Sequence, residues 1–312
     1  MRVGLIKHIQ ENKHPAPQWH PETPYRMKHA LQYLLESDIA NEVDILNPRE
    51  IDESCLKAVH DPEYLKSVEN ACRSGVDYLD GDTYLTSGSF DAARETAAAA
   101  IYAVDTIMSR KCDRIFLAGR PPGHHAEHNR GMGFCLINNV AVAAEAAIRY
   151  HGCRRVAIVD WDVHHGNGTQ NIFYDRSDIY YMSLHRFPFY PGSGTESEQG
   201  RGEGSGYTLN IPLPPGSDVD IYMAQFKQKI IPELEKYKPE LIVVSCGFDS
   251  HRDDPLGGMQ MTEDGFGQIT ASLVEVAQRF SEGRIFSAFE GGYNPEANAR
   301  SLYYHFRELQ KN

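Results

Sequence analysis

The sequence predicts an α/β protein in which helices cover both faces of a parallel sheet. Short, continuous apolar runs alternate with helical stretches along the middle and C-terminal parts of the chain. Most of these runs are followed directly by ionisable side chains. Continuous apolar runs are typical of parallel strands, because both faces of such strands are buried.

Five runs rich in Val, Ile and Leu are predicted strands, and the alanine-rich or amphipathic segments between them are predicted helices. In chain order they are helix 91–108, strand 114–118, helix 138–150, strand 156–159, strand 179–184, helix 219–237, strand 241–246, helix 263–280 and strand 285–289. Gly152 and Gly283 stand after the second and fourth helices, where C-caps are expected.

Composition narrows the classes of protein that fit. The 312 residues contain no low-complexity linker and no internal repeat, so we expect one domain over residues 1–312. A net charge of −12 argues against nucleic-acid and anionic-membrane binding, because both favour a basic surface. Neither a membrane span nor a signal peptide is expected, since no apolar run is long enough. The six scattered cysteines lack a CxxC pair, which favours reduced thiols in a cytoplasmic protein.

Chemically active side chains gather just after four of the predicted strands. In open α/β sheets, ligands bind at the carboxyl edge, where such residues would meet. A chance scatter of polar residues would not favour one end of every strand. The residues concerned are His124, His125, Asp160, Asp162, His164, Asp249, Glu290 and Tyr293.

A candidate metal site lies among these side chains. Asp160, Asp162 and His164 alternate, so in an extended segment they project to one side. Asp249 could approach from a neighbouring strand end. Two carboxylates and one imidazole suit a catalytic divalent metal, because three protein ligands leave a position for water. The alternative is a turn whose Asp and His side chains cap nearby helices.

His124 and His125 lie in a Pro-Pro-Gly loop, which restricts the backbone. Paired imidazoles beside a metal can take a proton from water and return it to a leaving group, although a structural His pair is the alternative. Tyr293 follows two glycines and could present its phenol to an oxyanion, or could simply pack. The glycine-rich segment 200–206 precedes a strand-like stretch and no helix, so we interpret it as a loop without phosphate binding.

Longer segments of the chain resemble the histone deacetylase and acetylpolyamine amidohydrolase family, and specifically its class II branch and its bacterial members. The resemblance runs from about residue 20 past Tyr293, over nearly the whole chain. It implies an arginase/deacetylase-like α/β fold with a central eight-stranded parallel sheet. The segments that carry it are RPPGHHA (120–126), GFCLIN (133–138), DWDVHHGNGTQ (160–170), SLH (183–185), GFD (247–249), DPLG (254–257) and EGGYN (290–294).

The resemblance implies an amidohydrolase in which Asp162, His164 and Asp249 hold one Zn²⁺, or Fe²⁺ in its place. The metal would activate water and polarise the amide carbonyl. Two-manganese ureohydrolases, which share the arginase-like fold, need further carboxylates where this chain has Gly166 and His251. A dinuclear site is therefore not expected.

The implied catalytic groups lie around that metal. His125 would act as general base and then general acid, His124 would give electrostatic support, and Tyr293 would donate a hydrogen bond to the oxyanion. Asp160 would orient His124, whereas Asn167 stands where some relatives carry an Asp facing His125. A neutral amide there favours a neutral His125, since no second carboxylate stabilises its cation.

Further positions are implied for potassium and for substrate. A structural K⁺ would be held by Asp160, Asp162, His164, Ser183 and Leu184, and a weaker one by carbonyls near Phe173, Arg176 and Ile179. The acyl-lysine tunnel would be lined by Gly133 and Phe134 and, on its other side, by Tyr190, where most relatives have Phe. Asp82 would lie at the rim and Arg26 at the pocket floor, and Leu256 would be a further substrate-binding residue.

The substrate implied is an acylated lysine in a peptide or protein, or an acetylated polyamine. Leu256 stands where polyamine-selective relatives can carry Glu, and this favours acyl-lysine. A short acyl group other than acetyl, such as lactyl, stays open, as do the metal in the cell and the oligomeric state. A catalytically silent acyl-lysine binding protein is the other alternative; such a protein would be expected to lose a ligand, a histidine or the tyrosine, and here all are present.

Overall fold

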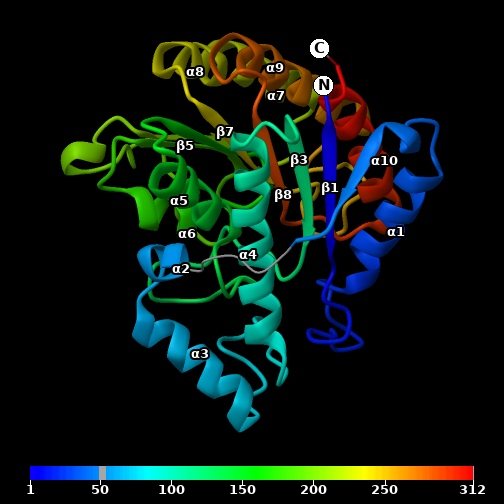
Figure 1. Cartoon of the computed structure of the whole chain (residues 1–312), viewed down its shortest axis with the longest axis vertical. Helices are drawn as coiled ribbons and strands as arrows, with labels where there is room; N and C mark the ends of the chain where they lie inside the picture. The colour runs from blue at the N-terminus through cyan, green and yellow to red at the C-terminus, as the bar shows by residue number, and fades with distance from the viewer. Residues whose placement is uncertain (49–53, 312) are drawn as a thin grey trace.

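A computed structural model describes residues 1–48 and 54–311, which fold around an eight-stranded parallel sheet (Figure 1). The strand order is β2-β1-β3-β8-β7-β4-β5-β6, and every neighbouring pair is parallel. The strands are β1 (Val3–His8), β2 (Val43–Leu46), β3 (Arg114–Gly119), β4 (Val156–Asp160), β5 (Ile179–Arg186), β6 (Thr208–Leu213), β7 (Leu241–Cys246) and β8 (Ile285–Phe289). The α/β class and the eight-stranded parallel sheet expected from the sequence are confirmed.

The central strands contribute side chains to two separate hydrophobic cores, one on each face of the sheet. On β7, Ile242 and Val244 belong to one core, whereas Leu241 and Val243 belong to the other. Helices cover both cores, with α1, α9 and α10 on one face and α4 and α5 on the other (Figure 1). The helices are α1 (Pro24–Glu36), α2 (Ser54–Val59), α3 (Pro62–Ser74), α4 (Ser89–Met108), α5 (Asn139–His151), α6 (Asn167–Phe173), α7 (Val219–Gln225), α8 (Ile231–Tyr237), α9 (Glu263–Phe280) and α10 (Pro295–Leu309).

The five predicted strands agree with the structure to within two residues. The other three strands of the sheet are β1, β2 and β6. A strand-like stretch was expected at β6, whereas β1 and β2 were not specified. On the edge strand β2 no residue is fully buried, so its sequence does not show the continuous apolar pattern of a central strand. The glycine-rich segment is a loop with a short turn, Gly202–Gly204, and it leads into β6 as expected.

The predicted helix 219–237 is wrong as a single α-helix. It is interrupted by a π-helical turn, Phe226–Ile230, between α7 and α8. Pro232 lies in the first turn of α8 and has no N–H to donate, so the regular hydrogen-bond ladder cannot continue through it.

One of the two predicted helix caps is confirmed. Gly152 is the C-cap of α5 and has a left-handed φ of 68°. The C-cap of α9 is Ser281, and Gly283 lies two residues farther on with a φ of 81°. Its N–H nevertheless donates to the carbonyl of Ala277, which closes the last turn of the helix.

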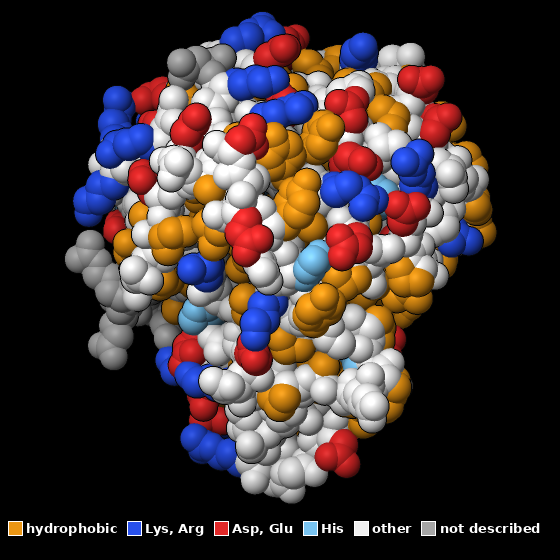
Figure 2. Space-filling model, turned by 90° about the vertical axis from the view of Figure 1, so that its right-hand side faces the viewer, with side chains coloured by type: hydrophobic (Ala, Val, Ile, Leu, Met, Phe, Trp, Pro, Cys, Tyr) orange, Lys and Arg blue, Asp and Glu red, His pale blue; other side chains and the backbone are white. Residues whose placement is uncertain are grey.

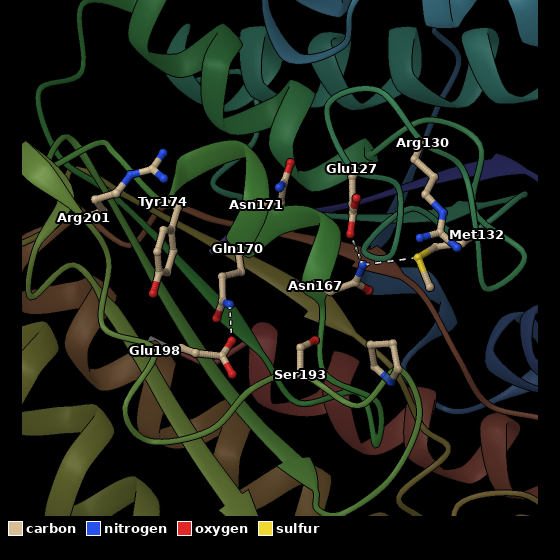
Figure 3. Close-up of a pocket in the computed structure, with 11 residues that line it drawn as sticks. Glu127, Arg130, Met132, Asn167, Gln170, Asn171, Tyr174, Ser193, Glu198 and Arg201 are labelled. Carbon is tan, nitrogen blue, oxygen red and sulfur yellow. Dashed lines mark hydrogen bonds between the residues drawn. The ribbon is translucent and has the colours of Figure 1, made fainter.

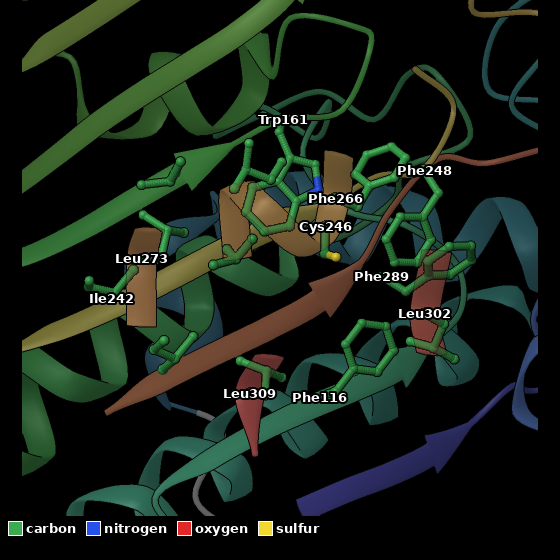
Figure 4. Close-up of a cluster of buried hydrophobic side chains, with 14 of the residues drawn as sticks. Phe116, Trp161, Ile242, Cys246, Phe248, Phe266, Leu273, Phe289, Leu302 and Leu309 are labelled. Atoms are coloured by element: carbon green, nitrogen blue, oxygen red, sulfur yellow. The ribbon is translucent and has the colours of Figure 1, made fainter. Parts of the chain in front are cut away.

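Aromatic side chains pack directly behind the carboxyl ends of the central strands (Figure 4). The rings of Phe248 and Phe266 are 5.1 Å apart, and those of Phe248 and Phe289 are 6.1 Å apart. Trp161, which follows β4, is fully buried in the same cluster. Dense packing of this kind leaves little freedom to the loops that leave the strands at this edge.

Charged side chains of both signs are mixed on the face shown in Figure 2, with apolar groups between them. Within residues 1–48 and 54–311, no helix is both long and apolar enough to span a membrane.

Candidate active site

The loops after four adjacent strands meet at the carboxyl edge of the sheet. The order β3-β8-β7-β4 places the four strand ends side by side. The loop after β3 carries His124 and His125, and the loop after β4 carries Asp162 and His164. The loop after β7 carries Asp249, and the one after β8 carries Tyr293.

Asp162, His164 and Asp249 form a compact cluster that could hold a metal ion. One ligand atom from each residue lies within 4.8 Å of the others. His164 Nδ1 is 3.1 Å from Asp162 Oδ1 and 3.2 Å from Asp249 Oδ2. The second oxygen of each carboxylate accepts a backbone N–H, from Gly291 to Asp162 and from Val163 to Asp249. Asp162 Oδ1 also accepts the N–H of His164 at 2.9 Å, so backbone donors fix both carboxylates while Asp162 Oδ1 and Asp249 Oδ2 face His164.

The donor set fits a divalent cation. Asp249 Oδ2 is buried and accepts no hydrogen bond, although His164 Nδ1 is only 3.2 Å away. Two buried carboxylates this close repel each other without a positive charge between them. Accordingly, burial and the neighbouring Asp162 raise the pKa of Asp249 to about 7. Carboxylate oxygens and an imidazole nitrogen are ligands that both zinc and ferrous iron accept.

His124 lies in a negatively charged environment. Its Nδ1 is 3.1 Å from Asp160 Oδ2, and its Nε2 is 3.7 Å from Asp162 Oδ1. Burial alone would favour the neutral ring, but Asp162 and Asp160 outweigh it and raise the pKa of His124 to about 10. Asp160 is held in turn by the phenol of Tyr181, which donates to its Oδ2 at 3.1 Å.

His125 has a neutral partner. Its Nδ1 is 2.7 Å from Asn167 Oδ1, and its ring lies edge-on to Tyr190 with centroids 5.2 Å apart. Burial, together with the neighbouring His124 and His164, lowers its pKa well below the ordinary value. The expected pairings of Asp160 with His124 and of Asn167 with His125 are therefore both present in the structure.

Tyr293 is positioned by its backbone and by an arginine beneath its ring. Its N–H donates to Asp254 Oδ2 at 2.6 Å, and the guanidinium of Arg26 lies 5.3 Å from the ring centre. Arg26 also donates to the carbonyls of Glu290 and Gly292, on either side of the glycine pair. Burial raises the pKa of the Tyr293 phenol, so the hydroxyl stays protonated and able to donate.

The predicted substrate-contacting residues lie around this cluster. Gly133 and Phe134 both have left-handed backbone angles, φ 56° and φ 69°, and a side chain at Gly133 would collide with the ring of His125. The Phe134 ring lies edge-on to that of Tyr293, with centroids 6.1 Å apart. Non-glycine residues at such angles are strained and cluster at functional sites. Tyr190 and Leu256 are exposed.

Asp82 is partly exposed and belongs to an acidic pair. Its backbone carbonyl lies 3.0 Å from His20 Nε2, and the ring of His20 packs edge-on against Phe134. Burial and the neighbouring Asp80 raise the pKa of Asp82. Thr83 Oγ1 accepts the N–H of Phe134 and lies 3.5 Å from Asp82 Oδ1, so this carboxyl group is close to Phe134.

A comparison with known proteins assigns the family. The Histone deacetylase domain model matches residues 20–309. The chain belongs to the histone deacetylase family. It is 36% identical to a probable deacetylase of Archaeoglobus fulgidus over 95% of this chain and 82% of that protein. It is 39% identical to a histone deacetylase-like amidohydrolase of Pseudomonas aeruginosa over 90% of this chain and 74% of that protein.

The fold of a solved family member is closely similar. The crystal structure of the HDA15 HD domain superimposes with a TM-score of 0.91 at 33% identity, covering 99% of this chain and 89% of that one. The family and the arginase/deacetylase fold expected from the sequence are confirmed. Membership of this family makes the chain a hydrolase of the deacetylase type.

The structure leaves no room at Gly166 for the further carboxylate ligand that a two-metal ureohydrolase needs. A Cβ there would lie 2.3 Å from Asp160 Oδ2 and 2.6 Å from the Tyr181 hydroxyl. His251 is turned away, with its Nε2 3.1 Å from Glu263. Within residues 1–48 and 54–311, the metal-competent group found is the single one of Asp162, His164 and Asp249.

The residues predicted to hold potassium are partly brought together. Asp160 and Ser183 are direct neighbours in the register of β4 and β5, and Ser183 Oγ lies 2.9 Å from His185 Nδ1. At the second predicted site, the carbonyl of Phe173 accepts the N–H of Arg176. Both potassium sites stay predictions.

Two buried acids, Glu22 and Glu290, hold loops of the candidate site in place, and the sequence alone did not predict this role. Glu22 is fully buried, accepts two 2.6 Å hydrogen bonds from Arg120 and pairs with Arg26 at 3.0 Å. Burial favours the neutral acid, but these guanidinium groups outweigh it and lower the pKa of Glu22. Glu290 accepts the N–H groups of Gly123 and His124, which ties the histidine loop to β8.

Glu290 stands inside a segment that carries the family resemblance, and Glu22 lies near the start of the region that the resemblance covers. Their partners lie far away in the sequence: Arg120 is 98 positions after Glu22, and Glu290 is 167 positions after Gly123. No local pattern predicts such pairings.

Proposed function

We propose that this chain is a metal-dependent deacylase that hydrolyses the N-acyl amide of acylated lysine side chains in peptides or proteins. The products would be the free amine and acetate or another short acid. The observation that carries the proposal is the cluster of Asp162, His164 and Asp249, with its unpartnered carboxylate oxygen, beside the histidine pair.

The metal would be Zn²⁺ or Fe²⁺, held by Asp162, His164 and Asp249. When bound, it would lower the pKa of a water molecule and polarise the amide carbonyl. The backbone donors Gly291 and Val163 keep the two carboxylates in place, so the ligands are oriented before the metal arrives.

His125 would move the proton. Its Nδ1–H donates to Asn167 Oδ1, which leaves the lone pair of Nε2 to accept a proton from the attacking water. The same nitrogen would then return the proton to the leaving amine. The low pKa of His125 keeps the ring neutral and therefore ready to act as a base.

His124 and Tyr293 would stabilise developing charge. The carboxylates around His124 keep it protonated, so it would supply a fixed positive charge without taking part in proton transfer. The neutral phenol of Tyr293 would donate a hydrogen bond to the oxyanion of the tetrahedral intermediate.

Substrate selection would depend on the wall and the rim. Gly133, Phe134 and Tyr190 would enclose the acyl-lysine chain. Asp82 at the rim would attract a peptide backbone or a cationic group. Leu256, which is 41% exposed, offers no charge to a polyamine, and this supports acyl-lysine over acetylpolyamine.

We further propose that residues 1–312 act as a single catalytic domain in the cytoplasm. Both cores flank one sheet, which supports one folding unit. All six cysteines are buried, and among the described residues none of them forms a disulfide, which suits a reducing compartment. A structural K⁺ between Asp160 and Ser183 would hold the end of β4 against β5, and a second, weaker K⁺ would be bound near Phe173, Arg176 and Ile179.

A substrate panel tests the proposed function. Purified protein loaded with zinc or with ferrous iron, and chelated protein, would be assayed on acetyl- and lactyl-lysine peptides and on N-acetylputrescine. Turnover of the peptides that is lost on chelation is expected, and Tyr293→Phe should lower kcat by about 10²–10³-fold. A clear preference for the polyamine would overturn the assignment to lysine. Absence of any turnover in all metal forms would favour a silent acyl-lysine binding protein.

A further inference from the structure

A cavity of about 520 Å³ opens beside the candidate active site (Figure 3). Asn167, at the start of α6, forms part of its wall and also contacts His125. Asn167 therefore separates the cavity from the histidine pair. The residues that line the cavity are Glu127, Arg130, Met132, Asn167, Gln170, Asn171, Tyr174, Pro191, Ser193, Glu198 and Arg201.

The amide of Asn167 has three partners, and together they fix its orientation. Its Nδ2 donates to Glu127 Oε1 at 2.8 Å and to Met132 Sδ at 3.4 Å, as the dashed lines in Figure 3 show. An ionised carboxylate and a thioether accept hydrogen bonds and cannot donate them. The nitrogen of the amide must therefore face the cavity, and the oxygen must face His125.

The orientation of the amide decides where the proton of a neutral His125 lies. Because Asn167 Oδ1 can only accept, His125 Nδ1 must carry the hydrogen across the 2.7 Å contact. The lone pair of the ring is then on Nε2. If the amide turned over, its NH₂ group would face Nδ1 and would favour the opposite tautomer.

Glu127 is rigidly held at the turn that follows the two histidines. Its N–H donates to the carbonyl of Arg130 at 2.8 Å, and its own carbonyl lies 2.9 Å from His60 Nδ1. Of the two acceptors for Asn167 Nδ2, Glu127 is the closer and the charged one, and hydrogen bonds to charged acceptors are the stronger.

We propose that Glu127 is a positioning residue that holds the Asn167 amide in one orientation and thereby sets the tautomer of His125. The inference rests on the proposed function for its catalytic consequence, because a base at Nε2 requires this tautomer. Glu127 itself touches neither substrate nor metal ligands in this scheme. Its effect passes through one amide group.

The contact between Glu127 and Asn167 can be tested by changing one residue and then both. The single substitution should lower kcat, and the second should restore part of it. In Asn167→Asp, a carboxylate oxygen replaces the amide nitrogen that is 2.8 Å from Glu127 Oε1, and the two acids repel each other. We expect kcat to fall by about 10- to 100-fold with KM little changed. In the double variant with Glu127→Gln, the glutamine amide can donate to the new aspartate, so kcat should rise several-fold above that of Asn167→Asp alone; the loss that remains reports the carboxylate that now faces His125. An equal effect of Asn167→Asp in both backgrounds would overturn the proposal.

A second measurement does not depend on turnover. ¹⁵N shifts of the His125 ring, identified with His125→Ala, report its tautomer in metal-free and zinc-loaded protein. Wild type and Glu127→Gln, whose amide oxygen can still accept, should show the hydrogen on Nδ1. Glu127→Leu removes the acceptor and should populate the opposite tautomer. An unchanged tautomer in a folded Glu127→Leu protein would refute the positioning role.

A matched control separates this effect from a change in the cavity itself. Arg201 lines the same cavity, and its guanidinium pairs with Asp175 at 2.6 Å. Arg201→Ala should leave both kcat and the His125 tautomer unchanged. If no acylated amine is hydrolysed, the proposed function fails, and the tautomer measurement still decides whether Glu127 orients Asn167.

Discussion

The two histidines of the candidate active site are adjacent in sequence and both buried, yet they lie in opposite electrostatic environments. Carboxylates of Asp160 and Asp162 surround His124 and raise its pKa to about 10. Across the site, His125 faces the neutral amide of Asn167, and burial lowers its pKa. The partner of each ring, and not its burial, therefore decides which imidazole is charged.

This difference suits two separate tasks. A permanently charged imidazole can stabilise negative charge, whereas a neutral one can accept and return a proton. A site with two equivalent histidines would perform neither task as well, because both rings would compete for the same proton. The comparison can be tested by removing His125, by giving both histidines the same kind of partner, and by examining a buried histidine elsewhere in the molecule.

The largest effect should follow removal of His125, the neutral histidine. His125→Ala should lower kcat by about 10²–10⁴-fold, because it removes the neutral imidazole that would take the proton. Steady-state kinetics on an acetyl-lysine peptide, with metal content measured in parallel, would check this. If turnover stays within tenfold of wild type while the metal content is unchanged, another group acts as the base.

Giving His124 a neutral partner like that of His125 should have the next largest effect. Asp160→Asn would give both histidines an amide partner, and His124 would lose one of the charges that keep it protonated. We expect kcat to fall by about 10- to 100-fold. Because Asp160 is also a predicted potassium ligand, thermal unfolding in K⁺ and in Na⁺ should accompany the kinetics. A variant with unchanged kcat would contradict the electrostatic role of His124.

A histidine far from the cluster extends the comparison to stability. His305 is fully buried between Thr270 and Ser287, and burial lowers its pKa to about 3. The native state therefore binds fewer protons than the unfolded state between pH 6.5 and 3, so stability falls as the pH falls through this range.

Urea unfolding at pH 7 and pH 5 measures this effect. Between these pH values the wild type should lose about 2 kcal/mol more stability than His305→Gln, because the glutamine does not titrate. Equal losses in both proteins would show that His305 does not resist protonation in the folded state.

The smallest effect concerns charge at the rim. Leu256 is exposed, so Leu256→Glu should cost little stability. An exposed carboxylate near a cationic substrate contributes about 0.2–1 kcal/mol, so kcat/KM for N-acetylputrescine should rise by about 1.4- to fivefold relative to an acetyl-lysine peptide. Leu256→Gln is the uncharged control. An equal change in both variants would show that charge at this position does not select the substrate.

The position of the candidate site could be predicted from the sequence because parallel strands end at one edge. Once residues 156–159 and 241–246 are recognised as strands, Asp162 and Asp249 must lie at that edge. Their meeting requires that β4 and β7 be neighbours, which the structure shows. The alternation of Asp162 and His164 is a local pattern, and it is readable without a structure.

The rest depended on contacts between distant parts of the chain. Nothing local predicts that Glu22 binds Arg120, or that Glu127 lies 2.8 Å from Asn167 across 40 residues. Edge strand β2 lacks the apolar pattern of central strands because none of its residues is fully buried. The interruption of the helix 219–237 could have been anticipated from Pro232, since proline removes a hydrogen-bond donor.

The crowding at Gly166 limits how this protein could be redesigned. Any side chain at this position would displace Asp160, Tyr181 or His124, whose atoms already occupy the space around its Cα. Converting the chain to a two-metal hydrolase would therefore require the environment of His124 to be rebuilt before a new ligand could be introduced. Single-site libraries at Gly166 should yield poorly active or poorly folded protein, and only combined libraries that include positions 160 and 181 have a route to a second metal.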